Sequence, residues 1–188
     1  MPSFPGPLRV SSDGRYFTDQ SGEPLFWLGD TQWELCRSLQ LDDVCAVLED
    51  RRRKGFSVLQ VMLTGVGDGT GPNVAGDTPW RDDNPDTPNE RYFARVDAVL
   101  ELVRDTGVAI VLGVYHQLHE SRVTASNARA HARWVAGRYR DAPHVVWAVY
   151  PRADEAFLPV VRELAAGLQE GDDGQHLITV HPDPSPAS

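Results

Sequence analysis

Hydrophobic positions along the chain alternate between the period of helices and the short continuous runs of buried strands. Four stretches repeat apolar residues at helical spacing, and short β-branched runs lie between them. Continuous apolar strands of this kind are typical of a parallel sheet that is covered on both faces. The pattern therefore predicts an α/β fold of repeated strand–helix units. The five expected strands lie near Trp27, Leu59, Ile110, Val146 and Ile178.

Each predicted helix has one apolar face and ends at a residue that interrupts helices. The ends are expected near Gly55, at Gly107, before Pro143 and at Gly171. The four apolar faces consist of Leu41, Val44, Cys45 and Leu48; Tyr92, Val96, Val99 and Val103; Ala128, Ala132, Val135 and Tyr139; and Phe157, Val161, Leu164 and Leu168.

The N-terminal residues lack this alternation and carry turn chemistry instead. Ser12-Asp13-Gly14 and Ser21-Gly22 predict turns, with Arg15 to Thr18 and Leu25 to Leu28 as flanking strands. We therefore expect a β-hairpin or small meander in residues 1–26, the strand–helix region in residues 27–183 and a disordered tail in residues 184–188.

Residues 64–88 form the longest predicted loop, far longer than the roughly two to six residues of an ordinary strand-to-helix connection. Loops of this length are usually functional or disordered. The turn residues of this segment and the aromatic Trp80 favour an ordered active-site rim over a plain linker.

Composition narrows the class of protein. The chain has 188 residues, a net charge of -9 and 41% hydrophobic residues, which fits one folded domain and excludes wholesale disorder. The acidic balance argues against broad nucleic-acid binding, because phosphate-binding surfaces carry a basic excess. No Gly-rich phosphate motif is present, and no cofactor is expected.

Membrane insertion and secretion find no support in the sequence. No stretch approaches the ~20 apolar residues that a membrane span requires. The start, MPSFPGP, has neither a basic segment nor an apolar run, so we expect a cytoplasmic protein. Cys36 and Cys45 are expected to be reduced packing residues.

Polar and aromatic residues gather after the predicted strands, where parallel α/β folds bind their ligands. Carboxylates, amides, imidazoles and aromatic rings at one rim suit a carbohydrate, because hydroxyls need polar partners and sugar C–H faces pack on rings. A structural alternative remains: Asp30 caps the next segment, while Trp33 and Trp80 cover the end of the sheet. The candidates for substrate binding are Asp30, Trp33, Glu34, Gln60, Asn73, Trp80, His116, Tyr150 and His181.

Several segments, in order along the chain, resemble the apiosidase-like glycoside hydrolases, a bacterial family of (β/α)₈ barrels. The resemblance covers Leu8 to about His181. It implies a partial TIM-type barrel of about five parallel strands with outer helices after an N-terminal β-hairpin, and a C-terminally truncated domain, because eight strands need about 250 residues. The matching segments are LRVSSDGRYFTDQSGEPLFWLGDTQWEL, LEDRRRKGFSVLQ, GPNVAG, PNERYFARVD and NARAHARWVAGRYRDAPHVVW.

The same resemblance implies two catalytic carboxylates, one after strand four and one after strand seven. Arg152 occupies the expected acid/base position, and a guanidinium cannot release a proton near neutral pH. Asp154 and Glu155 are the remaining candidates, although both also suit the first turn of the following helix. The seventh strand lies beyond the five that are expected.

Residues carried over from the family concern sugar binding. Asp30, Trp33 and Glu34 match its Gly-Asp-Thr-x-Trp-Glu signature, and Gln60 and Asn73 match polar positions after strand two. The segment YHQLHE departs from the family pattern. His116 in this segment is therefore a candidate by its position alone.

Three interpretations of function remain open. The first is a glycoside hydrolase that cleaves plant-type poly- or oligosaccharides, and the second is a non-catalytic pseudoenzyme that binds carbohydrate or a partner. The third is an unstable fragment. A metal site at His116, His119, Glu120 and His181 is disfavoured, because their spacing matches no common zinc motif. The apolar edge strands near Trp27 and Ile178 predict a homodimer.

Overall fold

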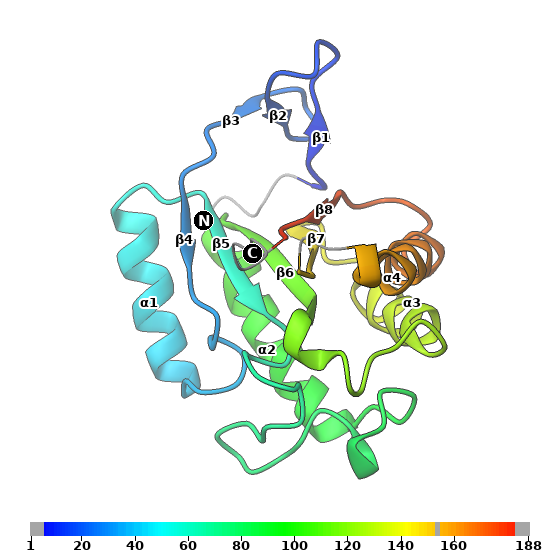
Figure 1. The fold of residues 1–188 in the computed structure, drawn as a ribbon. Coiled ribbons are helices and arrows are strands. Elements are labelled where there is room, and N and C mark those ends of the chain that lie inside the picture. The colour runs from blue at the N-terminus through cyan, green and yellow to red at the C-terminus, as the bar shows by residue number, and fades with distance from the viewer. Residues whose placement is uncertain (1–5, 153–154, 183–188) are drawn as a thin grey trace, which may run out of the picture.

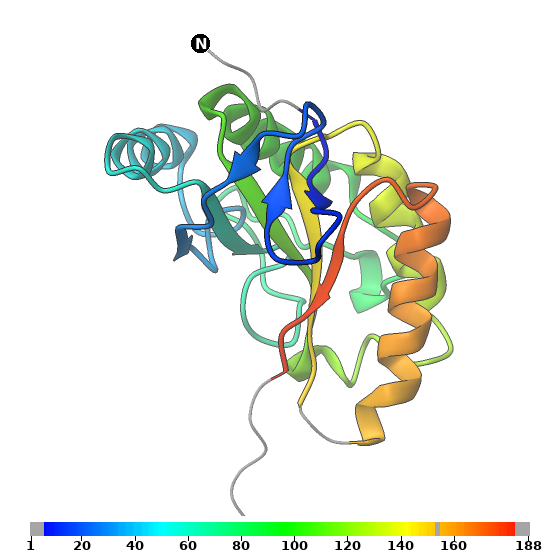
Figure 2. The same ribbon diagram turned by 90° about the horizontal axis from the view of Figure 1, so that it is seen from above.

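The computed structural model describes residues 6–152 and 155–182. Five parallel strands form one sheet in chain order, and the helices lie along its outer side (Figures 1 and 2). The α/β architecture with five parallel strands is thus confirmed. The strands are β4 (Gly29–Thr31), β5 (Val58–Met62), β6 (Ala109–His116), β7 (Val145–Tyr150) and β8 (Ile178–Val180), and the helices are α1 (Leu41–Arg53), α2 (Glu90–Thr106), α3 (Ala128–Tyr139) and α4 (Leu158–Gly171).

The predicted helix faces are buried in α2 and α3 but only partly in α1. Asn89 caps α2 by accepting a hydrogen bond from the backbone of Arg91, and Gly107 ends it with a left-handed φ of 74°. In α1, Val44 and Leu48 are buried, whereas Cys45 is exposed. This helix covers the edge strand β4 and has a neighbouring helix on one side only, so its buried stripe is narrower than expected.

Both cysteines are free thiols, but they differ in environment. Cys36 is fully buried, and desolvation raises its thiol pKa to about 12. Its packing role is therefore as expected. Cys45 is exposed, which corrects the expectation that it packs in the core.

The sheet separates two clusters of buried side chains, because successive strand residues point to opposite faces. Leu59, Ile110 and Trp147 point outward into the larger core beneath the helices. Val111 and Tyr150 point inward, toward the axis that a closed barrel would have. The inner cluster becomes polar toward the carboxyl ends of the strands. It is the part of the fold that positions the candidate site.

The N-terminal residues form a three-stranded antiparallel meander of β1 (Arg9–Val10), β2 (Phe17–Thr18) and β3 (Pro24–Leu25). Leu8 packs into the inner cluster and covers the amino ends of the parallel strands. The predicted strand Leu25–Leu28 is therefore shorter, and the first parallel strand begins at Gly29 rather than around Trp27. Trp27 instead lies 5.0 Å from the Phe17 ring. The predicted tail 184–188 lies outside the described residues.

The loop between β5 and α2 has its own hydrogen-bonded structure. It contains the short 3₁₀ turn Arg81–Asp83 and a β-bridge between Trp80 and Pro88. The side chain of Asn73 accepts hydrogen bonds from the backbone of Ala75 and Asp77 at 2.9 and 3.1 Å. These bonds agree with the expectation of an ordered loop. Within the described ranges, no helix is long and apolar enough to cross a membrane.

Candidate functional site

Tyr150, the last residue of β7, lies at the centre of a polar and aromatic group on the inner face of the sheet. Gln60 of β5 donates a hydrogen bond of 2.8 Å from Nε2 to the Tyr150 hydroxyl. The rings of Trp33 and His181 meet the Tyr150 ring edge-on, with centroids 5.2 and 5.1 Å away. We call Trp33, Gln60, Tyr150 and His181 the Tyr150 cluster. The structure thus brings together four of the residues that the sequence predicts for substrate binding.

The alternation of the strands explains this grouping. Val58, Gln60 and Met62 face inward on β5, so Gln60 is the polar member of an otherwise apolar inner stripe. Between β5 and β7, Gly113 of β6 has no side chain. A Cβ there would lie 2.6 Å from Cε2 of Tyr150 and would also collide with Met62. The glycine therefore leaves the space in which Gln60 reaches the Tyr150 hydroxyl.

His116 borders the Tyr150 cluster. In the parallel register of β6 and β7, His116 lies opposite Tyr150, at the carboxyl ends of both strands. Its Nδ1 accepts a hydrogen bond from the backbone of Leu118 at 3.2 Å, and its own backbone N–H donates to Nδ1 of His119 at 3.2 Å. The imidazole of His116 is half-buried and is held at the rim.

A cavity of about 180 Å³ opens beside the cluster. Gln60, Tyr150 and His181 line it, and Thr179 of β8 contributes a hydroxyl. Thr179 is not among the residues predicted from the sequence, although the two-residue period of its strand places it on the same face as His181. Burial raises the pKa of the Tyr150 phenol, against the effect of the Gln60 hydrogen bond, so the hydroxyl remains protonated. The site offers hydroxyl, amide and imidazole groups beside aromatic rings.

Asp30 does not join the Tyr150 cluster. It pairs in register with the outward-facing Leu59, and its carboxylate binds Arg51 of α1 and Gln32. Burial works to raise the Asp30 pKa, but the hydrogen bonds from Arg51 and Gln32 and the Arg51 charge hold it below its ordinary value. The expectation of an Asp30 on the sugar-binding floor is corrected: the side chain joins β4 to α1 on the helix side.

Glu34 and Asn73 organise the β5–α2 loop. Glu34 accepts hydrogen bonds from Arg37 at 2.7 and 2.9 Å and from the backbone of Val66 at 2.8 Å. Asn73 closes the turn with Ala75 described above. Asn73 lies within the loop, whereas Glu34 lies between β4 and α1 and contacts the loop through Val66.

Trp80 is a core residue of the same loop. Its side chain is 1% exposed and packs edge-on against His119 and His131, at centroid distances of 6.2 and 5.6 Å. An indole this deeply buried presents no surface to a ligand. This corrects the expectation that Trp80 contacts substrate and agrees with the alternative in which it covers the end of the sheet.

The region after β7 holds the residues considered for catalysis. Arg152 lies with its guanidinium 5.0 Å from the Phe157 ring centre and 3.4 Å from the Glu120 carboxylate. Glu155 is exposed and begins the 3₁₀ turn Glu155–Phe157 that leads into α4. It lines a separate hollow of about 350 Å³ with Phe157 and Val161, and not the cavity beside Tyr150. Asp154 lies outside the described residues.

His119 and His131 are buried and neutral. Desolvation lowers the pKa of His119 to about 3 and that of His131 to about 4, so both are neutral. Among residues 6–152 and 155–182, no three His, Cys, Asp or Glu side chains gather in a way that could hold a metal ion.

A buried hydrogen-bonded network lies between α4 and β8 and is not predicted from the sequence. The Asp172 carboxylate accepts a hydrogen bond of 2.7 Å from the Trp147 indole and lies 2.9 Å from Nδ1 of His176. His176 in turn contacts the Ala142 carbonyl at 3.1 Å. This network fixes the turn between α4 and β8, on the helix side of the sheet, and no motif in the sequence indicates it.

Comparisons with known proteins agree with this architecture. A family model described as the apiosidase-like catalytic domain matches residues 11–188. A solved glycoside hydrolase shares 28% identity with a TM-score of 0.85, covering 94% of this chain and 41% of its own. A glycoside hydrolase family 5 protein from Bacteroides vulgatus ATCC 8482 shares 26% identity with a TM-score of 0.84, covering 94% of this chain and 40% of its own.

More distant structures share the fold alone. A glycoside hydrolase family 5 mannosidase from Rhizomucor miehei is 17% identical, with a TM-score of 0.70, over 95% of this chain and 56% of its own. A comparison with the curated proteins finds no match.

Five consecutive parallel strands, joined by four helices and carrying a polar, aromatic inner rim, define part of a glycoside-hydrolase-like (β/α) barrel. The chain spans 41% of the length of the first glycoside hydrolase above and 40% of the length of the family 5 protein from Bacteroides vulgatus ATCC 8482. It belongs to the apiosidase-like catalytic domain family, whose model covers residues 11–188. The resemblance noted in the sequence is thereby confirmed.

Proposed function

We propose that the Tyr150 cluster binds a sugar unit of a glycoside-hydrolase substrate. The observation that carries the proposal is the hydrogen bond between Gln60 and Tyr150, flanked by the rings of Trp33 and His181. The bond fixes the amide and the hydroxyl in place before a ligand arrives. Preorganised polar groups of this kind reduce the entropy cost of binding.

The chemistry of the cluster suits a neutral, polyhydroxylated ligand. The Gln60 amide offers an oxygen acceptor in addition to the donor that it uses on Tyr150, and the imidazole of His181 adds a polar edge. The rings supply apolar surface for the C–H face of a sugar. No acidic side chain belongs to the Tyr150 cluster, so the site lacks the strong field that would select a charged ligand.

A second candidate function, sugar binding without turnover, is favoured by Arg152. Its fixed charge neither donates nor accepts a proton near neutral pH, and it would lower the pKa of a neighbouring carboxyl that must stay protonated to act as an acid. Of the two candidate carboxylates, Glu155 lies within the described residues, and its substitution tests this alternative.

The two functions are separated by one pair of assays. Calorimetric titration with apiose-bearing, manno- and cello-oligosaccharides measures binding, and release of aryl aglycones measures hydrolysis. We expect Gln60→Ala to weaken binding about tenfold, the effect of losing one partly buried hydrogen-bonding group. Gln169→Ala, an exposed amide on α4, is the matched control and is expected to bind as the wild type does.

Turnover that disappears in Glu155→Gln supports the hydrolase, whereas unchanged turnover in that variant excludes Glu155 as the catalytic carboxylate. Binding without turnover of any glycoside supports the non-catalytic function. Absence of binding and of turnover contradicts both.

A further inference from the structure

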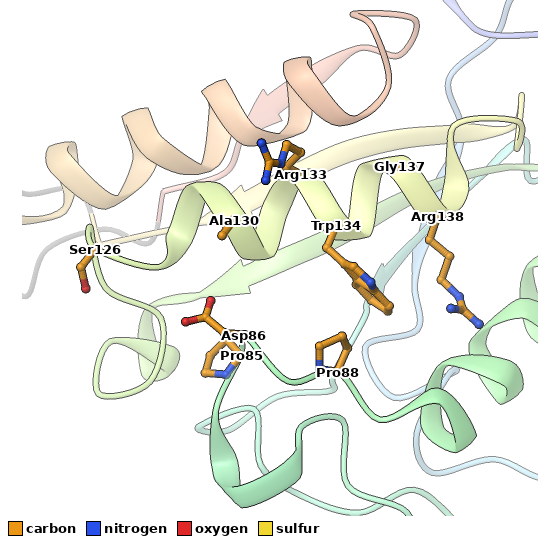
Figure 3. Close-up of a pocket in the computed structure, with 9 residues that line it drawn as sticks. All are labelled: Pro85, Asp86, Pro88, Ser126, Ala130, Arg133, Trp134, Gly137 and Arg138. Carbon is orange, nitrogen blue, oxygen red and sulfur yellow. The ribbon is translucent and has the colours of Figure 1, made fainter.

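A large hollow lies on the outer side of the fold. A groove of about 730 Å³ runs between α3 and the end of the β5–α2 loop (Figure 3). Pro85, Asp86 and Pro88 form its loop wall, and Trp134 and Arg133 belong to its helix wall. The volume falls within the range of about 300–1,000 Å³ that is usual for small-molecule sites.

The groove is independent of the Tyr150 cluster and of both sheet edges. Its walls come from α3, from Ser126 just before α3 and from residues 85–88, and no described residue of β4 or β8 lines it. The Tyr150 cluster lies on the inner face of the sheet, whereas α3 covers the outer side (Figure 2). A ligand in the groove would therefore leave the inner face free.

The helix wall is held in place by contacts outside the groove. Arg138 donates hydrogen bonds to Asp97 at 3.0 and 2.8 Å and to Glu90 at 2.8 Å. The Trp134 ring packs edge-on against Phe93, with centroids 4.6 Å apart, and the Arg138 guanidinium lies 5.5 Å from its centre. The indole is thus fixed while part of it stays open to the groove, next to Pro88 (Figure 3).

The groove carries side chains of both charges. Arg138 forms ion pairs with Asp97 and Glu90. Asp86 on the loop wall and Arg133 on the helix wall take part in no ion pair within the described part of the chain, which leaves one negative and one positive group. A polyanion would also be repelled by the net charge of -9. The groove is therefore suited to a neutral ligand that both accepts and donates hydrogen bonds.

We propose that this groove is a second carbohydrate-binding site, which takes a neutral oligosaccharide along α3. The C–H face of one sugar packs on Trp134 and Pro88. Hydroxyl groups donate to the Asp86 carboxylate and accept from the Arg133 guanidinium on opposite sides of the groove. Such a site holds a chain on the outer surface of the domain while the Tyr150 cluster addresses another part of it.

The test is an NMR titration of the isotope-labelled chain with mannotetraose, cellotetraose and xylotetraose, with trigalacturonate as the anionic probe. The Trp134 indole N–H resonance is identified by its absence from the Trp134→Phe spectrum. We expect at least one neutral tetrasaccharide to shift this resonance at millimolar concentration. Asp86→Ala and Arg133→Ala should each weaken that binding about tenfold, whereas Asp43→Asn, an exposed charge change on α1, should leave it unchanged.

The same titration of Gln60→Ala separates the two sites: the Trp134 shifts should persist when the Tyr150 cluster is impaired. The proposal is overturned if no neutral tetrasaccharide moves the Trp134 resonance, or if the shift is unaffected by both wall variants. Tighter binding of trigalacturonate than of every neutral probe would overturn the assignment of a neutral ligand.

Discussion

The Gln60 amide donates a hydrogen bond of 2.8 Å to the Tyr150 hydroxyl and so joins the second and fourth parallel strands across the inner face of the sheet. The strand between them contributes Gly113, which has no side chain to block the contact. A polar pair is thereby preformed beside the rings of Trp33 and His181.

Gly113→Ala should disturb this pair directly. The new Cβ would lie 2.6 Å from the Tyr150 ring and would collide with Met62, so we expect a loss of about 1–3 kcal/mol in the free energy of unfolding. Urea denaturation measures the change. Gly137→Ala is the matched control, because its Cβ would meet only the Gly171 carbonyl, at 3.7 Å, and alanine favours a helix. Equal destabilisation by both changes would contradict the packing described for Gly113.

Asp30→Asn tests the ion pair with Arg51. The folded-state pKa of Asp30 lies below its ordinary value, so its stabilisation is present above that ordinary value, 3.8, and is lost as the pH falls through the lower folded value. At pH 7 we expect the free energy of unfolding of the wild type to exceed that of Asp30→Asn by about 1 kcal/mol, since the pair is partly exposed. This difference should shrink on acidification. Urea midpoints at pH 7 and at acidic pH measure this difference. A gap that grows in acid would contradict the pairing.

His119 and His131 should make the fold sensitive to mild acid. Burial lowers their pKa from 6.5 to about 3 and about 4, so the unfolded chain takes up protons first as the pH falls below 6.5. Between pH 6.5 and 5 each histidine should lower the free energy of unfolding by roughly 2 kcal/mol. His119→Phe is expected to reduce the difference between urea midpoints at pH 7 and 5. An unchanged difference would show that His119 is not buried in a neutral form.

Self-association through the sheet edges remains a prediction from the sequence. The edge strands are β4 and β8. Trp27, shortly before β4, is 41% exposed, and Val180, the last residue of β8, is 49% exposed. We expect the chain to dimerise with rising concentration and Val180→Lys to shift it toward monomer, since a charge on an edge strand opposes pairing. Light scattering coupled to gel filtration measures the mass. A monomer at all concentrations would contradict the prediction.

Periodicity predicted the fold well because burial on one helix face or in a continuous strand leaves a regular trace. The face of α2 with Val96 and Val99 is buried as expected. The same reasoning failed for Cys45, since a sequence does not reveal that α1 covers an edge strand. The order of the strands likewise placed Gln60, Tyr150 and His181 at one rim.

The remaining site residues could not be assigned from the sequence. A position at the end of a strand does not determine the face of the sheet toward which the side chain points. Asp30 follows the correct strand but faces Arg51 on the helix side. Trp80 belongs to the correct loop but is buried beside His131. A conformation inside a long loop depends on tertiary contacts that residue type alone does not encode.

The most direct test is to identify the residues that a bound sugar contacts. In an NMR titration with the oligosaccharide that binds most tightly by calorimetry, we predict shifts of the Gln60 side-chain amide and the Trp33 indole N–H, and their loss in Tyr150→Phe. Tyr16→Phe, which removes an exposed hydroxyl, should bind as wild type. Binding that leaves Gln60 and Trp33 unshifted, or that survives unchanged in Tyr150→Phe, would contradict a carbohydrate site at the Tyr150 cluster.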